Sequence, residues 1–215
     1  KNDRPSIAKP TNYIISWLKK VVINPSMINE YELFSSDTQG YLIITRPLFE
    51  PVLDDLIAIL EEQGFTVYVK YVDDIVYEYI GLDIPEKIRS CIKDYYWYYN
   101  ISYVLLFGDA DPDDIYTGYT LDKSWEVPTR YVYNPDPDGG NDQYYTGLPN
   151  DLTPTDYYYA GLDGTWDNDN DGYYGESETY SGTGQDEADW LADVFVGRLP
   201  VRTIGDAWNY INKLM

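Results

Sequence analysis

Residues 101–109 read ISYVLLFGD, a continuous apolar run that ends in Gly108 and Asp109. A run of this length without alternating polar residues is typical of a strand buried on both faces of a parallel sheet. YLIIT at residues 41–45 has the same character, and FTVYVKYV at 65–72 is rich in β-branched and aromatic residues. These segments predict three strands of one sheet, with YLIIT and YVLLF central and adjacent.

An amphipathic helix is predicted between each strand and the next. PVLDDLIAILEEQG (51–64) closes on Gly64, and IPEKIRSCIKDYYWYYN (84–100) carries Pro85 near its first turn. Strands that alternate with helices at this spacing form right-handed crossovers, which make the strands parallel and place helices on both faces. VFVGRLPV (194–201) supplies a later strand. The predicted fold class is α/β, a mainly parallel sheet flanked by helices.

The remaining sequence predicts an N-terminal extension and a long insertion. Residues 1–40 combine one amphipathic run with turn-rich polar residues, which predicts a helical and turn extension before an α/β unit at 41–215. Between the third strand and 194–201 the chain is rich in Asp, Gly, Pro, Asn and Tyr and has little periodicity. Such long loops are usually functional or are held together by something else, and this one starts where open α/β sheets bind ligands.

The composition limits the possible partners. The chain has 37 acidic and 15 basic residues, a formal net charge of −22, and 44% hydrophobic residues. We therefore expect a folded protein that repels nucleic acid and anionic lipid and attracts cations. No apolar run reaches the roughly 20 residues that a membrane-spanning helix needs.

The sequence lacks the residues for histidine-dependent catalysis. The chain contains no histidine and one cysteine, Cys91. This composition excludes a Ser/His/Asp triad, a Cys/His dyad, a histidine zinc site and an internal disulfide. Apolar residues recur at helical spacing around Cys91, so we expect it to be a buried core residue.

Residues 165–178 read TWDNDNDGYYGESE and indicate a cation site. Their spacing matches the calcium-loop pattern D-x-[DN]-x-[DN]-G-x5-E, in which alternating side chains converge on one ion and a glycine permits the sharp turn. The predicted cofactor is therefore Ca²⁺. Its predicted ligands are alternating carboxylates, one backbone carbonyl, one of two rival closing glutamates and a nearby aspartate: Asp167, Asp169, Asp171, Tyr173, Glu176 or Glu178, and Asp163.

This loop has two other possible interpretations. The flanking segments PTDYYYAGLDG and TYSGTGQDE do not have helical patterns, which argues against an EF-hand sensor. A solvated acidic turn is the second alternative. It is disfavoured because crowded carboxylates repel one another unless a divalent ion neutralises them. The preferred interpretation is a structural calcium clamp within a long acidic insertion.

The chain is also rich in aromatic residues, with 25 tyrosines and 6 tryptophans. Aromatic surfaces can stack on sugars or bind proteins. The favoured alternative is that most tyrosines lie between the core and polar loops, where each hydroxyl finds a partner.

Several segments, taken in order from about residue 41 to the end, resemble the gingipain-type cysteine peptidases. They are YLIIT with its following helix, DIPEKIR, YVLLFGDAD, VPTRYVY, TDYYYAGLDGTW with the acidic loop, and DVFVGRLPVRT. The resemblance implies a caspase-like α/β catalytic domain made of two similar subdomains. This chain would be the first, a caspase- or flavodoxin-like half that stops short of the catalytic subdomain, with GRLPV near the far edge of its sheet.

The catalytic residues of that family are a histidine in a Gly-His-Gly-like turn and a cysteine at a later strand end, both in the second subdomain. Neither motif occurs here. No catalytic residue is therefore carried over, and we expect this chain alone to be inactive. The resemblance instead implies scaffold residues, expected in buried ion pairs or loop-bracing hydrogen bonds: Asp109, Arg130, Asp156 and Arg198.

Together these features predict the N-terminal, non-catalytic subdomain of a gingipain-like cysteine endopeptidase, extracellular or on a prokaryotic cell surface and stabilised by calcium. Its expected partners are the second catalytic subdomain of the same polypeptide and, in the full-length form, a protein or peptide substrate. Two alternatives are kept: a non-enzymatic calcium-braced surface module, and a carbohydrate-binding or adhesion domain that uses the tyrosines.

Overall fold

The computed structural model describes residues 39–110, 123–133, 152–170, 172, 174–175, 186 and 188–214. The predicted N-terminal extension therefore lies almost wholly outside the described residues. Residues 41–215 were predicted to form one α/β unit, and the described part of that range contains the sheet and helices considered below.

Four parallel strands form the main sheet, in the order β2-β1-β3-β6. Their bounds are Gly40–Thr45 for β1, Thr66–Tyr71 for β2, Ile101–Phe107 for β3 and Phe195–Leu199 for β6. Ile43 pairs with Val69 on one side and with Leu105 on the other. The predicted parallel sheet, with the first and third strands central and adjacent, is confirmed.

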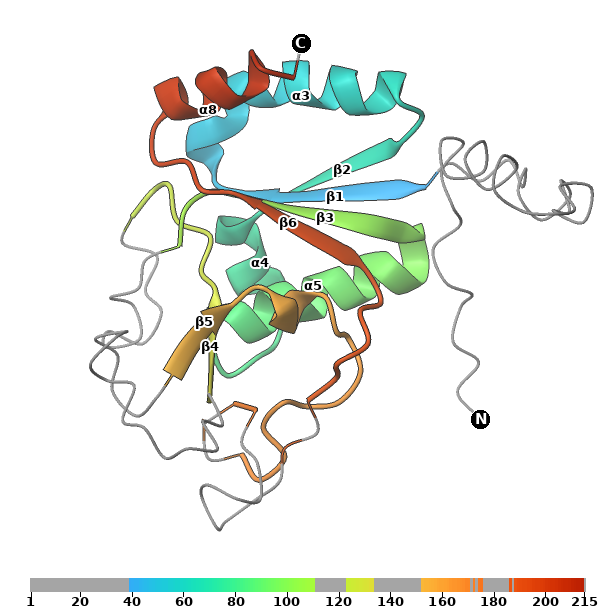
Figure 1. The fold of residues 1–215 in the computed structure, drawn as a ribbon, viewed down its shortest axis with the longest axis vertical. Coiled ribbons are helices and arrows are strands. Elements are labelled where there is room, and N and C mark those ends of the chain that lie inside the picture. The colour runs from blue at the N-terminus through green and yellow to red at the C-terminus, as the bar shows by residue number, and fades with distance from the viewer. Residues whose placement is uncertain are drawn as a thin grey trace, which may run out of the picture.

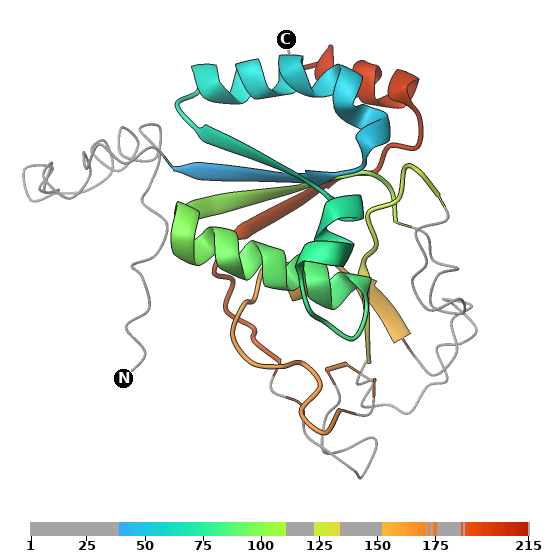
Figure 2. The same ribbon diagram turned by 180° about the vertical axis from the view of Figure 1, so that it is seen from behind.

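Helices cover both faces of this sheet (Figures 1 and 2). The short 3-10 helix η2 (Pro47–Phe49) leads into α3 (Glu50–Glu62), which lies with α8 (Ile204–Ile211) on one face. On the opposite face lie α4 (Val72–Glu78) and α5 (Ile84–Tyr99). The described chain is thus a three-layer α/β arrangement.

The two faces of β1 explain its uninterrupted apolar sequence. Ile43 packs into the core beneath α3 and α8, whereas Leu42 and Ile44 pack into the core beneath α4 and α5. All three side chains are completely buried. A strand buried on both faces needs apolar residues at every position, which is why the alternating pattern of a half-exposed strand is missing.

Local signals mark the helix ends: Pro85 in the first turn of α5 and Gly64 after α3 were predicted, and the cap of α5 by Asp83 was not. The side chain of Asp83 caps α5 by accepting a hydrogen bond from the backbone N–H of Glu86 at 3.0 Å. Gly64 follows α3 with a φ of 94°, a left-handed conformation that glycine adopts without strain. The prediction missed α4: Val72, assigned to the second strand, is instead the first residue of this short helix.

The insertion contains a second, small sheet. Strand β4 (Arg130–Tyr133) pairs antiparallel with β5 (Leu152–Thr155), and η4 (Tyr157–Tyr159) follows directly. Tyr158 and Tyr159 are completely buried, as expected for tyrosines that join the core to polar loops. None of the helices in the described part of the chain combines the length and apolar character that a membrane span requires.

Candidate metal centre

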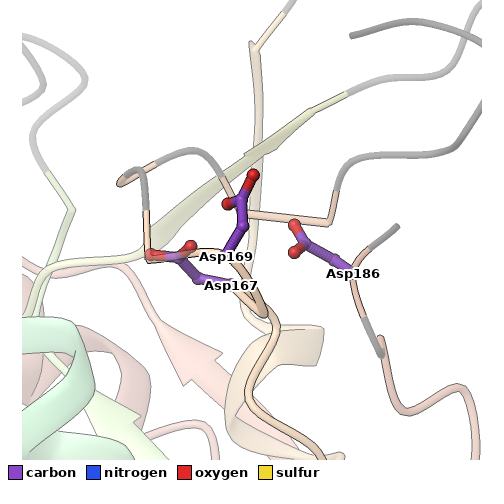
Figure 3. A group of neighbouring side chains, drawn as sticks. All are labelled: Asp167, Asp169 and Asp186. Atoms are coloured by element: carbon purple, nitrogen blue, oxygen red, sulfur yellow. The ribbon is translucent and has the colours of Figure 1, made fainter. Parts of the chain in front are cut away.

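Three carboxylates converge in the acidic loop. Oxygen atoms of Asp167, Asp169 and Asp186 all lie within 4.8 Å of one another. Figure 3 shows Asp167 and Asp169 on one loop and Asp186 on a separate segment that reaches toward them. Asp167 and Asp186 are buried, with 5% and 9% of their surface exposed, whereas Asp169 is exposed.

Backbone hydrogen bonds fix the directions of two of these carboxylates. Asp167 Oδ2 accepts from the N–H of Gly172 at 3.1 Å, and Asp186 Oδ1 accepts from the N–H of Asn168 at 2.7 Å. Asn170 and Gly172 both have positive φ, of 58° and 87°. This left-handed backbone is the sharp turn for which the sequence pattern reserves its glycine.

The start of the acidic loop packs against buried aromatic side chains. Trp166, next to Asp167, is 1% exposed and makes an edge contact with the Tyr158 ring at 5.6 Å between centroids. Arg89 of α5 is 4% exposed and donates to the backbone carbonyls of Gly161 at 2.7 Å and Asp163 at 2.8 Å. Burial lowers the pKa of the Arg89 guanidinium. Buried residues of the core therefore hold the segment that leads into the acidic loop.

The predicted ligands divide into three groups. Asp167 and Asp169 are brought together. Asp163 is exposed and does not belong to the convergent group, and its backbone N–H donates to Asp189 Oδ2. Four other predicted ligands lie outside the described residues, and their role remains a prediction: Asp171, Tyr173, Glu176 and Glu178.

Asp186 is the residue that the sequence pattern did not find. It lies beyond the calcium-loop motif, in a stretch that the sequence identified only as acidic loop. A spacing rule describes ligands on one turn of chain, so it cannot locate an aspartate that returns from a separate segment. Only the tertiary structure places Asp186 beside Asn168.

The arrangement suits a hard metal ion. Oxygen ligands are those preferred by calcium, magnesium and manganese, and the three carboxylates fit any of these ions. Carboxylates this close together repel one another unless a cation or protons neutralise them. The group could therefore hold a metal ion of this hard, oxygen-preferring class.

The described residues contain no cysteine nucleophile ready for reaction. Cys91 lies within α5, is completely buried, and its pKa is raised to about 12 by burial. Such a thiol carries almost no thiolate near neutral pH. The buried core position predicted for Cys91 is confirmed.

The four predicted scaffold residues form ion pairs. Arg130 pairs with Asp83 at 2.6 Å, Arg198 with Asp156 at 2.7 Å, and Arg202 with Asp109. Arg130 is 1% exposed, and Arg198 also donates to the carbonyl of Gly108. The ion pairs of Arg130 and Arg198 lie in buried or partly buried positions, as expected, whereas Arg202, the partner of Asp109, is exposed. The sequence did not identify Asp83 or Arg202 as partners.

These features define a parallel α/β domain whose insertion carries an acidic cluster and whose cysteine belongs to the core. The sequence model described as peptidase family C25 matches residues 35–215. The chain therefore belongs to peptidase family C25, the gingipain family.

A solved structure supports the fold. The crystal structure of dimeric latent PorU from Porphyromonas gingivalis matches with a TM-score of 0.52 and 20% sequence identity. The match covers 80% of this chain and 15% of that chain, so this chain spans a small part of the PorU polypeptide. At this identity the likeness concerns the fold alone. A comparison with curated proteins gave no significant match.

Proposed function

We propose that this chain is the N-terminal, non-catalytic subdomain of a C25 cysteine endopeptidase, with residues 41–215 as its α/β unit. The observation that supports this proposal most directly is the family match over residues 35–215 in a chain without histidine. Its single cysteine is completely buried in α5. The histidine and the reactive cysteine would come from a second subdomain of the same polypeptide.

Calcium bound by Asp167, Asp169 and Asp186 would stabilise this subdomain. The ion would join two segments of the insertion that meet at the Asn168–Asp186 hydrogen bond. Because the ion binds the folded chain, its binding free energy adds to stability. The cluster lies in the insertion and contains no cysteine or histidine, which supports a scaffold role.

The substrates of the full-length protein would be proteins or peptides, as membership of a peptidase family implies. We further propose an extracellular or cell-surface location in a prokaryote. Extracellular calcium-binding modules work with dissociation constants of ~10⁻⁴–10⁻³ M. A site with three carboxylates would be filled at the calcium concentrations to which such modules are adapted.

The test compares this chain with a longer polypeptide that carries a second subdomain with histidine and cysteine. We expect cleavage of casein by the longer polypeptide under reducing conditions, and loss of that cleavage when the second-subdomain cysteine is changed to alanine. Calcium should raise the melting temperature of both proteins. A folded, calcium-stabilised longer polypeptide without activity would contradict the peptidase proposal and favour the non-enzymatic surface module.

A further inference from the structure

The segment Lys123–Thr129, called the strap below, crosses the carboxyl end of β3. The N–H of Val127 donates to the carbonyl of Asp109 at 2.9 Å, and Asp109 forms a parallel β-bridge with Glu126. A Cβ atom at Gly108 would lie 2.6 Å from the carbonyl oxygen of Trp125. The strap is therefore packed directly on the sheet edge where open α/β sheets bind their ligands.

Side chains from other elements hold the backbone of the strap. Arg46, which follows β1, donates to the carbonyl of Lys123 at 2.7 Å. Arg198 of β6 donates to the carbonyl of Val127 at 2.6 Å, and the Tyr159 hydroxyl donates to the carbonyl of Pro128 at 2.6 Å. The backbone of the strap is thus tied to both strands that flank β3.

The side chain of Glu126 contrasts with this well-bonded backbone. Glu126 is 0% exposed, and neither of its carboxylate oxygens has a hydrogen-bond partner among the described residues. Buried polar side chains are normally hydrogen-bonded, so a carboxyl group without a partner requires a physical explanation.

The cations around the strap are committed to other groups. Three arginines each pair with a different carboxylate: Arg46 with Asp73, Arg198 with Asp156, and Arg202 with Asp109. The ammonium of Lys123 lies 5.5 Å from the centre of the Trp125 ring. Among the described residues, a charged Glu126 would therefore be buried without an ion pair, which costs far more than burying a neutral carboxyl group.

We propose that Glu126 is a proton-operated latch, protonated while the strap is closed and ionised when the strap opens and uncovers the carboxyl edge of the sheet. An exposed glutamate has a pKa of ~4.3. Above that pH the open form releases a proton that the closed form retains, so rising pH favours opening. The closed strap is most stable at acid pH. Its stability declines as the pH rises above the pKa of the exposed glutamate, and the decline ends where the closed form itself ionises.

The experiment measures urea unfolding of the 215-residue chain from pH 5 to pH 8, at constant calcium, for wild type, Glu126→Gln and Glu126→Met. Methionine has a similar shape without an ionisable group, so it tests the latch even if glutamine packs poorly. Between the pKa of the exposed glutamate and that of the buried one, we expect the unfolding equilibrium constant of wild type, divided by that of Glu126→Met, to rise about tenfold per pH unit. The matched control is Glu62→Met at an exposed position of α3, which should show no such trend.

Hydrogen exchange locates the opening. After correction for intrinsic rates, protection of the Glu126 and Val127 amides should fall with pH in wild type and stay constant in Glu126→Met. A ratio of unfolding constants that does not change with pH would overturn the latch. Loss of protection that is equal in the strap and in α3 would also overturn it, because opening would then be global.

Discussion

Arg130 and Asp83 face each other in a two-pronged ion pair. Arg130 Nη1 donates to Asp83 Oδ2 at 2.6 Å, and Nη2 donates to Oδ1 at 2.7 Å. The guanidinium carbon lies 3.6 Å from the centre of the Tyr174 ring. Because Asp83 also caps α5, this pair joins β4 of the insertion to the start of a helix that covers the main sheet.

The first prediction concerns this pair. Asp83→Asn keeps an oxygen that can cap α5 but removes the charge opposite Arg130, which is 1% exposed. Breaking a buried ion pair at one partner typically costs about 3–5 kcal/mol of unfolding free energy, because the other charge stays buried. Urea denaturation measures this loss. In contrast, Glu78→Gln at the exposed Lys70–Glu78 pair should cost at most about 1 kcal/mol. Equal losses in the two variants would refute a special role for the buried pair.

The second prediction separates Asp186 from Asp163 at the metal centre. Calcium at about 100 times its dissociation constant should stabilise the wild type by about 2.7 kcal/mol. Asp169→Ala should lose most of this gain because it removes an oxygen ligand, and Asp186→Asn should weaken it because it removes a carboxylate charge from the convergent group. Asp163→Asn is the matched control, an exposed acid before the same turn that should keep the gain. Thermal melting with calcium and with chelator is the measurement, and identical curves for all four proteins would reduce the loop to an acidic turn.

The third prediction follows from the Cys91 thiol. Burial raises its pKa from 9.0 to about 12, so the unfolded chain ionises before the folded one as the pH rises. The stability that Cys91 contributes is therefore full below about pH 9 and declines toward pH 12, by up to about 1.4 kcal/mol per pH unit. Unfolding measured from pH 8 to 11 for wild type and Cys91→Ala isolates this slope from titrating tyrosines. A difference that is flat across this range would show that the thiol is accessible to water.

The sequence predicted the sheet well because every position of its central strand is constrained. Leu42, Ile43 and Ile44 serve two cores, which leaves no choice but an apolar run. The start of α4 at Val72 was not predicted, since a seven-residue helix that directly follows a strand shows little periodicity of its own. Asp186 was missed for a different reason. Its role depends on a contact with Asn168 across a long loop, and local spacing carries no information about such a contact.

Local sequence does not reveal which residues pair as ions either. The basic and acidic residues expected to brace the insertion do so, yet neither Asp83 nor Arg202 could be identified from the pattern. Asp83 was visible only as a residue before a helix, where a cap is expected. Its second role arises because the fold places β4 against that helix end, and the burial of Arg130 makes the pairing necessary.

The last prediction is that this chain alone cleaves no peptide bond. A cysteine peptidase needs a thiolate beside a base, usually histidine, and this chain has no histidine. Its one thiol is completely buried, with a pKa of about 12, so neither substrate nor water reaches it in the folded state. The three convergent carboxylates are a poor substitute, because an aspartic pair shares a proton in a cleft, whereas two of these, Asp167 and Asp186, accept backbone N–H groups around a tight turn. The assay is casein, and fluorogenic peptides ending in Arg, Lys or Asp, with calcium and reductant. We expect no release above buffer from wild type or from Cys91→Ala.

Turnover lost in Cys91→Ala would place the nucleophile in this subdomain, and turnover retained in that variant would assign it to groups other than a thiol. Either outcome would contradict the scaffold role, because a chain that only supports a second catalytic subdomain has no group of its own to attack a peptide carbonyl.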